Sequence, residues 1–240
     1  MKRNMILLVM FTALAGLVSM QSCTKPHGPG YTEHYSFTTP VALAPISGTV
    51  VNLGDGVLSG NVSLQWNSTN QSGDAINGSL YFGTSSKPAL YASSQTAESV
   101  SVPVHGANTY YWYVIMTDAN GITTTGPTWS FTVYHPMNPY IGDYTCDEPA
   151  EDYTYDITFA MKTDYVLETV NYWNSGWTAD WTLDYTAKTY TMPLTTWGSY
   201  SAQESGTIDP STGTMTGNYT IFYKGSAIET GTHTYTRNTK

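Results

Sequence analysis

Apolar and polar residues alternate along most of this chain with the two-residue period of β-strands. Clear examples are residues 62–66 (VSLQW) and residues 129–133 (WSFTV). No stretch sustains the 3.6-residue period that would indicate an amphipathic helix. Gly, Asn, Asp and Pro, which favour turns, separate the alternating runs. The pattern therefore predicts an all-β protein.

Two stretches interrupt the alternation and divide the chain. Residues 23–39 are rich in Pro and Gly and poor in aliphatic residues, which predicts a flexible tether. Residues 135–139 (HPMNP) form a second break, which we interpret as a linker. The remaining segments, residues 40–134 and residues 140–240, are each long enough to bury a core of their own. We therefore expect two domains.

In the first domain, the alternating runs place large apolar residues on one face of each strand. Trp66 is expected to end the second strand, Tyr110 to open the sixth, and residues 129–133 to form the last. At these positions residues 40–134 resemble a fibronectin type III module, which is a β-sandwich of seven strands. Modules of this kind are commonly spacers or platforms, so the resemblance implies a fold and a spacing role, although fold alone does not establish function.

The second domain alternates more densely and contains about eight expected strands. One face of a strand carries Tyr153, Tyr155, Ile157, Phe159 and Met161, and one face of another carries Trp177, Ala179, Trp181 and Leu183. Turn residues at 174–176 and 209–213 predict hairpins. Eight antiparallel strands can close into a small barrel in which the first and last strands pair. The pattern, with a closing strand at residues 234–237, is similar to the lipocalin-like domains of Bacteroidetes lipoproteins.

The beginning of the chain has the features of an export signal. Lys2 and Arg3 precede an apolar run from Met5 to Val18, which is shorter than the roughly 20 residues that cross a bilayer. Residues 17–23 resemble a bacterial lipobox, with a small residue directly before Cys23. The resemblance implies a signal peptide over residues 1–22 and acylation of Cys23, which would anchor the protein without a spanning helix. We expect an outer-membrane lipoprotein of the Bacteroidetes kind, and the sequence leaves open on which side of the membrane it faces.

The charge of the expected mature chain excludes one class of partner. Loss of Lys2 and Arg3 from the nine basic residues leaves seven against 18 acidic residues. Because no basic stripe remains, nucleic acid is not an expected partner. Once Cys23 is acylated, Cys146 has no intramolecular partner, so we expect stability to come from burial and not from a disulfide.

Aromatic residues are the main candidates for ligand binding in the second domain, which contains four Trp, twelve Tyr and two Phe. Their rings can stack on the apolar faces of sugars, and they can equally fill a small barrel. The sequence leaves a filled core and a ligand-lined cavity or rim both open. A hairpin tip at residues 174–176 would leave one ring face of Trp173 exposed. The candidate ligand contacts are Tyr172, Trp173, Asn174, Ser175 and Trp197.

Acidic residues crowd between residues 143 and 156, and carboxylate oxygens suit calcium. The candidates are Asp147, Glu148, Glu151 and Asp152. Their spacing matches no calcium-loop signature, so a solvated acidic loop is the favoured interpretation. The histidines show no metal-ligand spacing, and no known nucleophile motif surrounds a Ser or Cys. We therefore expect neither a cofactor nor catalysis.

These expectations combine into one main functional hypothesis and two alternatives. In the main hypothesis, a non-enzymatic envelope lipoprotein uses its sandwich to space a barrel from the membrane, and the barrel binds a glycan or another small ligand. The first alternative is a structural lipoprotein, or one that binds other envelope proteins, with a solid barrel core. The second is a glycoside hydrolase or inhibitor. A cavity would favour the main hypothesis, an exposed apolar patch the first alternative, and two facing carboxylates in a cleft the second.

Overall fold

The computed structural model describes residues 38–68, 76–149 and 151–238. These residues form 17 strands and one short 3-10 turn, so the all-β prediction is confirmed. No helix in this part of the chain is long and apolar enough to cross a membrane. The expected signal peptide, Cys23 and the tether up to residue 37 lie outside the described residues, and acylation stays a prediction.

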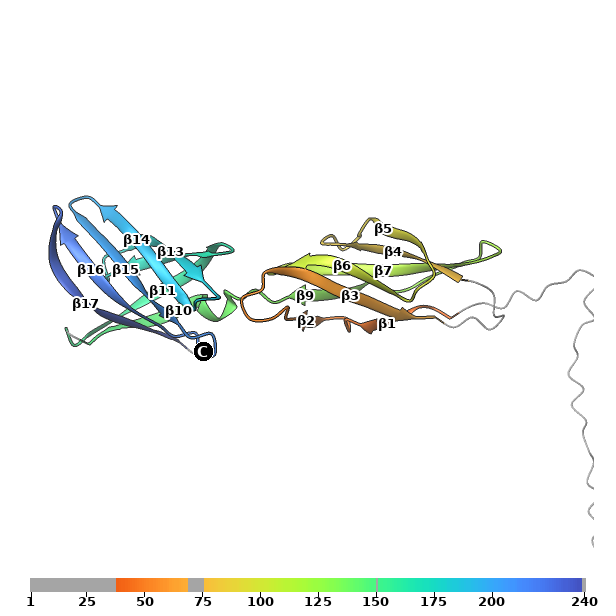
Figure 1. Ribbon diagram of the computed structural model, residues 1–240, viewed down its shortest axis with the longest axis horizontal. Coiled ribbons are helices and arrows are strands. Elements are labelled where there is room, and N and C mark those ends of the chain that lie inside the picture. Colours follow the sequence, from red (N-terminus) through yellow and green to blue (C-terminus); the bar gives the residue numbers. More distant parts are fainter. Residues whose placement is uncertain (1–37, 69–75, 150, 239–240) are drawn as a thin grey trace, which may run out of the picture. The chain divides into compact units, whose positions relative to one another are not determined.

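The first nine strands form the two sheets of a β-sandwich (Figure 1). One sheet has the order β1 (Val41–Ala44), β3 (Ser59–Asn67) and β6 (Ser99–His105). The other has the order β2 (Thr49–Val51), β9 (Trp129–Val133), β7 (Thr109–Asp118), β4 (Ile76–Gly83) and β5 (Leu90–Gln95), and β8 (Thr123–Thr125) pairs with β7. The strand β2 runs parallel to β9, and the other pairs are antiparallel.

The core of the sandwich is built from the large apolar residues that the alternating pattern assigned to one face of each strand. Trp66, Leu80 and Trp112 are fully buried in one apolar cluster. Trp66 lies near the end of β3, and Tyr110 is the second residue of β7. These strands are third and seventh in chain order and not second and sixth, because two short strands, β1 in one sheet and β2 in the other, precede β3. The relationship to the fibronectin type III family stays a prediction.

The last eight strands form a closed antiparallel barrel, which confirms the predicted architecture. Each strand pairs with the next, and β10 pairs with β17, so the first and last strands close the barrel as expected. The strands are β10 (Gly142–Glu148), β11 (Tyr153–Thr163), β12 (Val166–Tyr172), β13 (Trp177–Asp184), β14 (Thr189–Trp197), β15 (Tyr200–Ile208), β16 (Met215–Tyr223) and β17 (Ser226–Arg237).

Aromatic side chains fill the middle of the barrel. The ring of Trp181 lies 5.1 Å from Phe159, 4.8 Å from Tyr190 and 5.2 Å from Tyr235, measured between centroids. The inward alternation expected for β11 holds in the middle of the strand, where Phe159 is fully buried. It is wrong at both ends, where Tyr153 and Met161 are 42% and 41% exposed, because these residues lie beyond the packed layers of the core.

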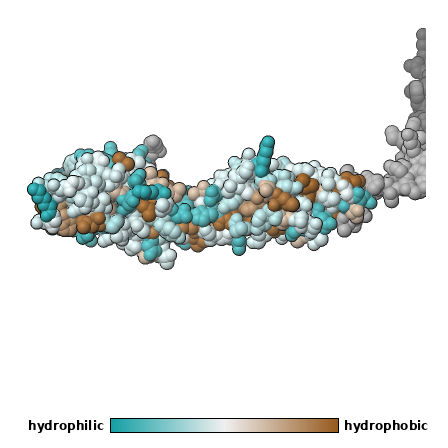
Figure 2. Space-filling view, turned by 90° about the horizontal axis from the view of Figure 1, so that it is seen from above, coloured by the Kyte–Doolittle hydropathy of each residue, from teal (hydrophilic) through white to brown (hydrophobic). Residues whose placement is uncertain are grey.

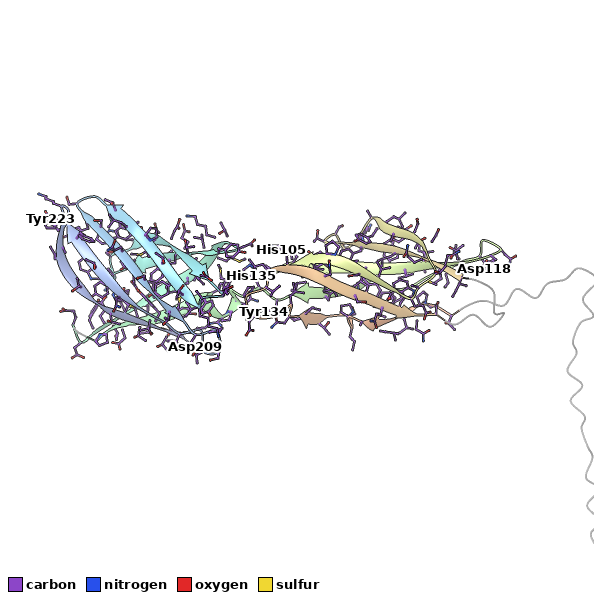
Figure 3. All side chains as sticks on the ribbon, in the orientation of Figure 1. His105, Asp118, Tyr134, His135, Asp209 and Tyr223 are labelled. Carbon is purple, nitrogen blue, oxygen red and sulfur yellow. The ribbon has the colours of Figure 1, made fainter. Side chains whose placement is uncertain are left out.

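The two ends of the barrel differ. Four turns, β10–β11, β12–β13, β14–β15 and β16–β17, share one end, which we call the aromatic end; Tyr223 lies there in Figure 3. The opposite end, near Asp209 in Figure 3, receives the segment that precedes β10, and we call it the capped end. Met137 and Tyr140 from this segment are fully buried in the barrel core. Tyr144 Oη donates a hydrogen bond to the carbonyl oxygen of Pro139 at 2.9 Å.

The expected linker at residues 135–139 is therefore more than a connection. Asn138–Tyr140 forms a 3-10 turn, and His135, Pro136 and Met137 are buried. Met137 from this segment contributes to the core that the barrel strands build. The domain boundaries themselves stay predictions.

Candidate functional site

Several ionisable side chains point into the barrel from inward-facing strand positions, which apolar core residues usually occupy. Cys146 and Glu148 come from β10, Glu204 from β15 and His233 from β17. All four are buried, and Glu148, the most accessible, is only 3% exposed. We call these four residues the buried cluster. Burial of charge without partners is unfavourable by several kcal/mol, so their contacts decide what the cluster can do.

His233 lies between the two carboxylates. Its Nδ1 is 2.8 Å from Glu204 Oε2, and its Nε2 is 3.0 Å from Glu148 Oε1. Burial by itself lowers the pKa of His233, but the hydrogen bonds to Glu148 and Glu204 outweigh burial and raise the pKa to about 9. Without another ligand, His233 is therefore an imidazolium at neutral pH and donates both hydrogen bonds. The ring of Tyr219 stacks on the imidazole with a centroid separation of 3.9 Å.

Three phenols hold the carboxylate of Glu204. Tyr190 Oη donates to Oε1 at 2.5 Å, while Tyr172 Oη and Tyr235 Oη donate to Oε2 at 3.1 Å and 3.0 Å. Burial, together with the nearby charge of Glu204, raises the pKa values of all three phenols, so they remain protonated donors. With His233, Glu204 accepts four hydrogen bonds, which compensates a carboxylate removed from water.

Cys146 adds a thiol to the cluster. It is a free cysteine, and burial raises the pKa of its thiol. A protonated thiol in such surroundings is a poor nucleophile. One ligand atom from each of Cys146, Glu148 and His233 lies within 4.8 Å of the others, which is a spacing that a metal ion can bridge. None of these groups is exposed enough to contact a dissolved substrate in this conformation.

A second group of side chains gathers at the aromatic end. Trp173, Trp177, Trp197, Tyr200 and Tyr223 come from the turns β12–β13, β14–β15 and β16–β17 or from the adjoining strand ends. The rings of Trp177 and Trp197 stack with a centroid separation of 4.7 Å and an interplanar angle of 7°. The ring centroid of Tyr200 lies 5.5 Å from that of Trp177 and 5.0 Å from that of Tyr223. We call these five residues the aromatic platform; four are half-buried and Tyr223 is exposed.

Two of the candidate ligand contacts belong to this platform. Trp173 lies 5.8 Å from Trp177, so Trp177 connects Trp173 with Trp197. The indole Nε1 of Trp197 donates to the carbonyl oxygen of Thr178 at 2.9 Å, which fixes that ring. Trp173 has a positive φ of 52° at the hairpin tip, and its amide donates to Tyr155 Oη at 3.1 Å.

The polar candidates beside Trp173 are engaged within the turn. Ser175 Oγ donates to the carbonyl oxygen of Tyr172 at 2.7 Å. The side-chain amide of Asn174 donates to Tyr153 Oη and remains exposed. Asn171 Nδ2 also donates to Asn174 Oδ1 at 3.3 Å, so the turn engages polar groups of both residues, and both residues remain exposed.

Tyr172 is not a surface ligand contact, and its assignment to the rim is corrected. The side chain is 0% exposed and its hydroxyl reaches Glu204. Leu167 and Thr169 face inward, so simple alternation would turn residue 172 outward. A β-bulge shifts the β12–β13 register between Val170 and Tyr172 and reverses the alternation, which turns Tyr172 into the core.

The four calcium candidates do not converge. Asp147, Glu151 and Asp152 are exposed, whereas Glu148 faces the barrel interior and pairs with His233. Adjacent residues of a strand point to opposite faces, so Asp147 and Glu148 of β10 cannot share one ion. The grouping of Glu148 with the acidic loop is wrong for this reason.

Sequence reasoning missed Glu204 and His233 as site residues. A usable signal was present, because both occupy inward positions in alternating strands. Glu204 follows Ala202 by two residues in β15, and His233 precedes Tyr235 by two in β17. A charged residue at an inward position of a barrel strand indicates a polar cluster in the core.

No protein-family model matches this chain, and no curated protein matches its sequence.

Proposed function

We propose that this protein is a non-catalytic, lipid-anchored protein of the bacterial cell envelope whose barrel binds a carbohydrate at its aromatic end. The aromatic platform carries the proposal. Indole and phenol rings combine apolar faces with hydrogen-bonding groups, which suits them to sugars. The exposed amide of Asn174 beside Trp173 adds a polar group that can bond to sugar hydroxyls.

The filled interior favours binding at the end of the barrel over binding inside it. An eight-stranded barrel has room for packed side chains or for one small ligand. Here Phe159, Trp181, Tyr190 and Tyr235 occupy the middle, with centroid separations of about 5 Å between neighbouring rings. A ligand of monosaccharide size or larger must therefore bind at the surface.

The charge of the chain favours a neutral sugar. Acidic residues outnumber basic residues by 18 to nine in the full sequence. An acidic glycan would be repelled by this excess of negative charge. The anchored state rests on the lipobox-like residues before Cys23, and the sandwich would act as a spacer between that anchor and the barrel.

Binding to a glycan array, followed by titration calorimetry with the best neutral hit, tests the proposal on the full chain. Trp177→Ala should weaken binding about ten-fold or more, because it removes the ring that joins Trp173 to Trp197. Tyr165→Ala is the matched control, because Tyr165 is 52% exposed and lies at the capped end. No hit for the unaltered chain, or equal binding by the Trp177 variant and the control, would refute the proposal.

One observation favours a second candidate, a structural or protein-interaction role with a solid core. The platform rings contact one another, and Trp197 lies between Trp177 and Tyr172, so they also stabilise the barrel end without a ligand. The face of the barrel seen in Figure 2 carries its hydrophobic residues in small separate patches and not in one continuous patch, so the support for this role comes from the packing of the platform. An interaction role predicts that Trp177→Ala loses a cross-linked envelope partner while the unaltered chain binds no glycan.

A further inference from the structure

The buried cluster lies across the seam that closes the barrel. The strands β10 and β17 are the first and last of the barrel, and they pair with Cys146 opposite Tyr235. Cys146 and Glu148 face inward from β10, and His233 faces inward from β17. Three different kinds of ligating atom, a sulfur, a carboxylate oxygen and an imidazole nitrogen, therefore meet within 4.8 Å in the barrel core.

The surroundings orient His233 as those of a metal ligand do. Metal-bound histidines usually donate the second ring N–H to a carboxylate or carbonyl, which fixes the tautomer and the ring. Nδ1 of His233 meets Glu204 at 2.8 Å, and Nε2 points toward Glu148 at 3.0 Å. Glu204 is itself held by three tyrosine hydroxyls. The imidazole therefore has Nδ1 committed to Glu204, while Nε2 meets Glu148, one of the two other ligand groups.

We propose that Cys146, Glu148 and His233 bind one zinc ion, with Glu204 as a positioning residue. A thiolate, an imidazole and a carboxylate together suit zinc, whereas calcium and magnesium prefer sites built from oxygen alone. Three protein ligands would leave one position of a tetrahedral ion for water.

Coordination of the ion by a thiolate and an imidazole nitrogen would release to solvent the thiol proton of Cys146 and any proton on the coordinating nitrogen of His233.

The position of the site determines the effect of the ion. Glu148 is the last residue of β10, directly before the β10–β11 turn at the aromatic end. An ion held by β10 and β17 would cross-link the two strands that close the barrel, which are 85 residues apart at Glu148 and His233. Metal binding would then stabilise barrel closure.

Cobalt(II) titration of the metal-stripped full chain tests the proposal. A thiolate ligand gives cobalt a near-ultraviolet charge-transfer band, and tetrahedral cobalt absorbs in the visible. We expect saturation at one ion per chain, displacement by zinc, and release of protons on binding. The chain has only two cysteines, so Cys23→Ser should keep the charge-transfer band and Cys146→Ser should abolish it.

Matched variants separate ligands from neighbours. Glu148→Gln should lower the affinity about ten-fold or more, whereas Asp147→Asn on the outward face of the same strand should leave it unchanged. Glu204→Gln should lower the affinity about 10- to 100-fold while retaining the thiolate band, because it alters only the orientation of His233. Far-ultraviolet circular dichroism checks that each variant folds.

The unaltered chain alone can overturn the proposal, whatever the variants do. Failure to take up cobalt or zinc at one equivalent would refute it, as would saturation without a thiolate band. A band that survives Cys146→Ser, or equal losses of affinity in Glu148→Gln and Asp147→Asn, would also contradict it.

Discussion

Replacement of Trp181 by alanine measures how much of the barrel's stability comes from its aromatic core. The side chain is 0% exposed and its ring contacts Phe159, Tyr190 and Tyr235. Truncation of a buried Trp to Ala typically costs about 3–5 kcal/mol, and an aromatic pair contributes about 0.5–1.5 kcal/mol beyond burial. Because Trp181 contacts three aromatic rings, we expect its packing to contribute a loss in unfolding free energy near the upper end of the 3–5 kcal/mol range, about 5 kcal/mol.

One feature of Trp181 opposes this loss. Its indole Nε1 is buried and has no hydrogen-bond partner among the described residues. An unsatisfied buried donor costs about 1–3 kcal/mol, and the substitution removes it. The expected net loss for Trp181→Ala is therefore about 3 kcal/mol. Trp181→Phe removes the same donor but keeps most of the ring contacts, so its loss should be about 1 kcal/mol.

Urea unfolding of the full chain, followed by circular dichroism, measures both losses in the transition that belongs to the barrel. Trp173→Ala is the control, because Trp173 is only half-buried at a hairpin tip, and its loss should be much smaller than that of Trp181→Ala. A loss below about 1 kcal/mol for Trp181→Ala would refute the packed core, because removal of the central indole from a filled barrel leaves a large cavity. A loss for Trp181→Phe as large as that for Trp181→Ala would show that the ring contacts retained by phenylalanine contribute nothing to stability.

Three further predictions concern other parts of the chain. Trp66→Ala should destabilise the sandwich by about 3 kcal/mol in the same unfolding assay, because its indole Nε1 is also buried without a partner among the described residues; a change below about 1 kcal/mol would show that Trp66 is outside the core. Met137→Ala should cost about 2 kcal/mol or more in the barrel transition, because Met137 is buried in the barrel core; a plain linker residue would cost less than about 0.5 kcal/mol. Cys23→Ser should release the protein from the membrane fraction or leave it unprocessed, as judged by fractionation and mass spectrometry, and unchanged retention and mass would contradict the anchor.

The sequence by itself determined the strand content and most of the packing. Alternation is a local property, because successive side chains of a strand point to opposite faces whatever the strand pairs with. Trp66, Phe159 and Trp181 could therefore be assigned to cores from their immediate neighbours. The strand count and the turn residues also sufficed to predict an eight-stranded barrel closed by its first and last strands.

Only the tertiary structure decided which polar residues meet. Glu148, Glu204 and His233 belong to β10, β15 and β17, and barrel closure with its particular register brings them together. A single bulge in β12 turns Tyr172 from the rim into the core, because one residue of register shift reverses every side chain that follows. Such shifts and long-range pairings depend on the whole barrel, so local pattern could predict the strands but not the site they build.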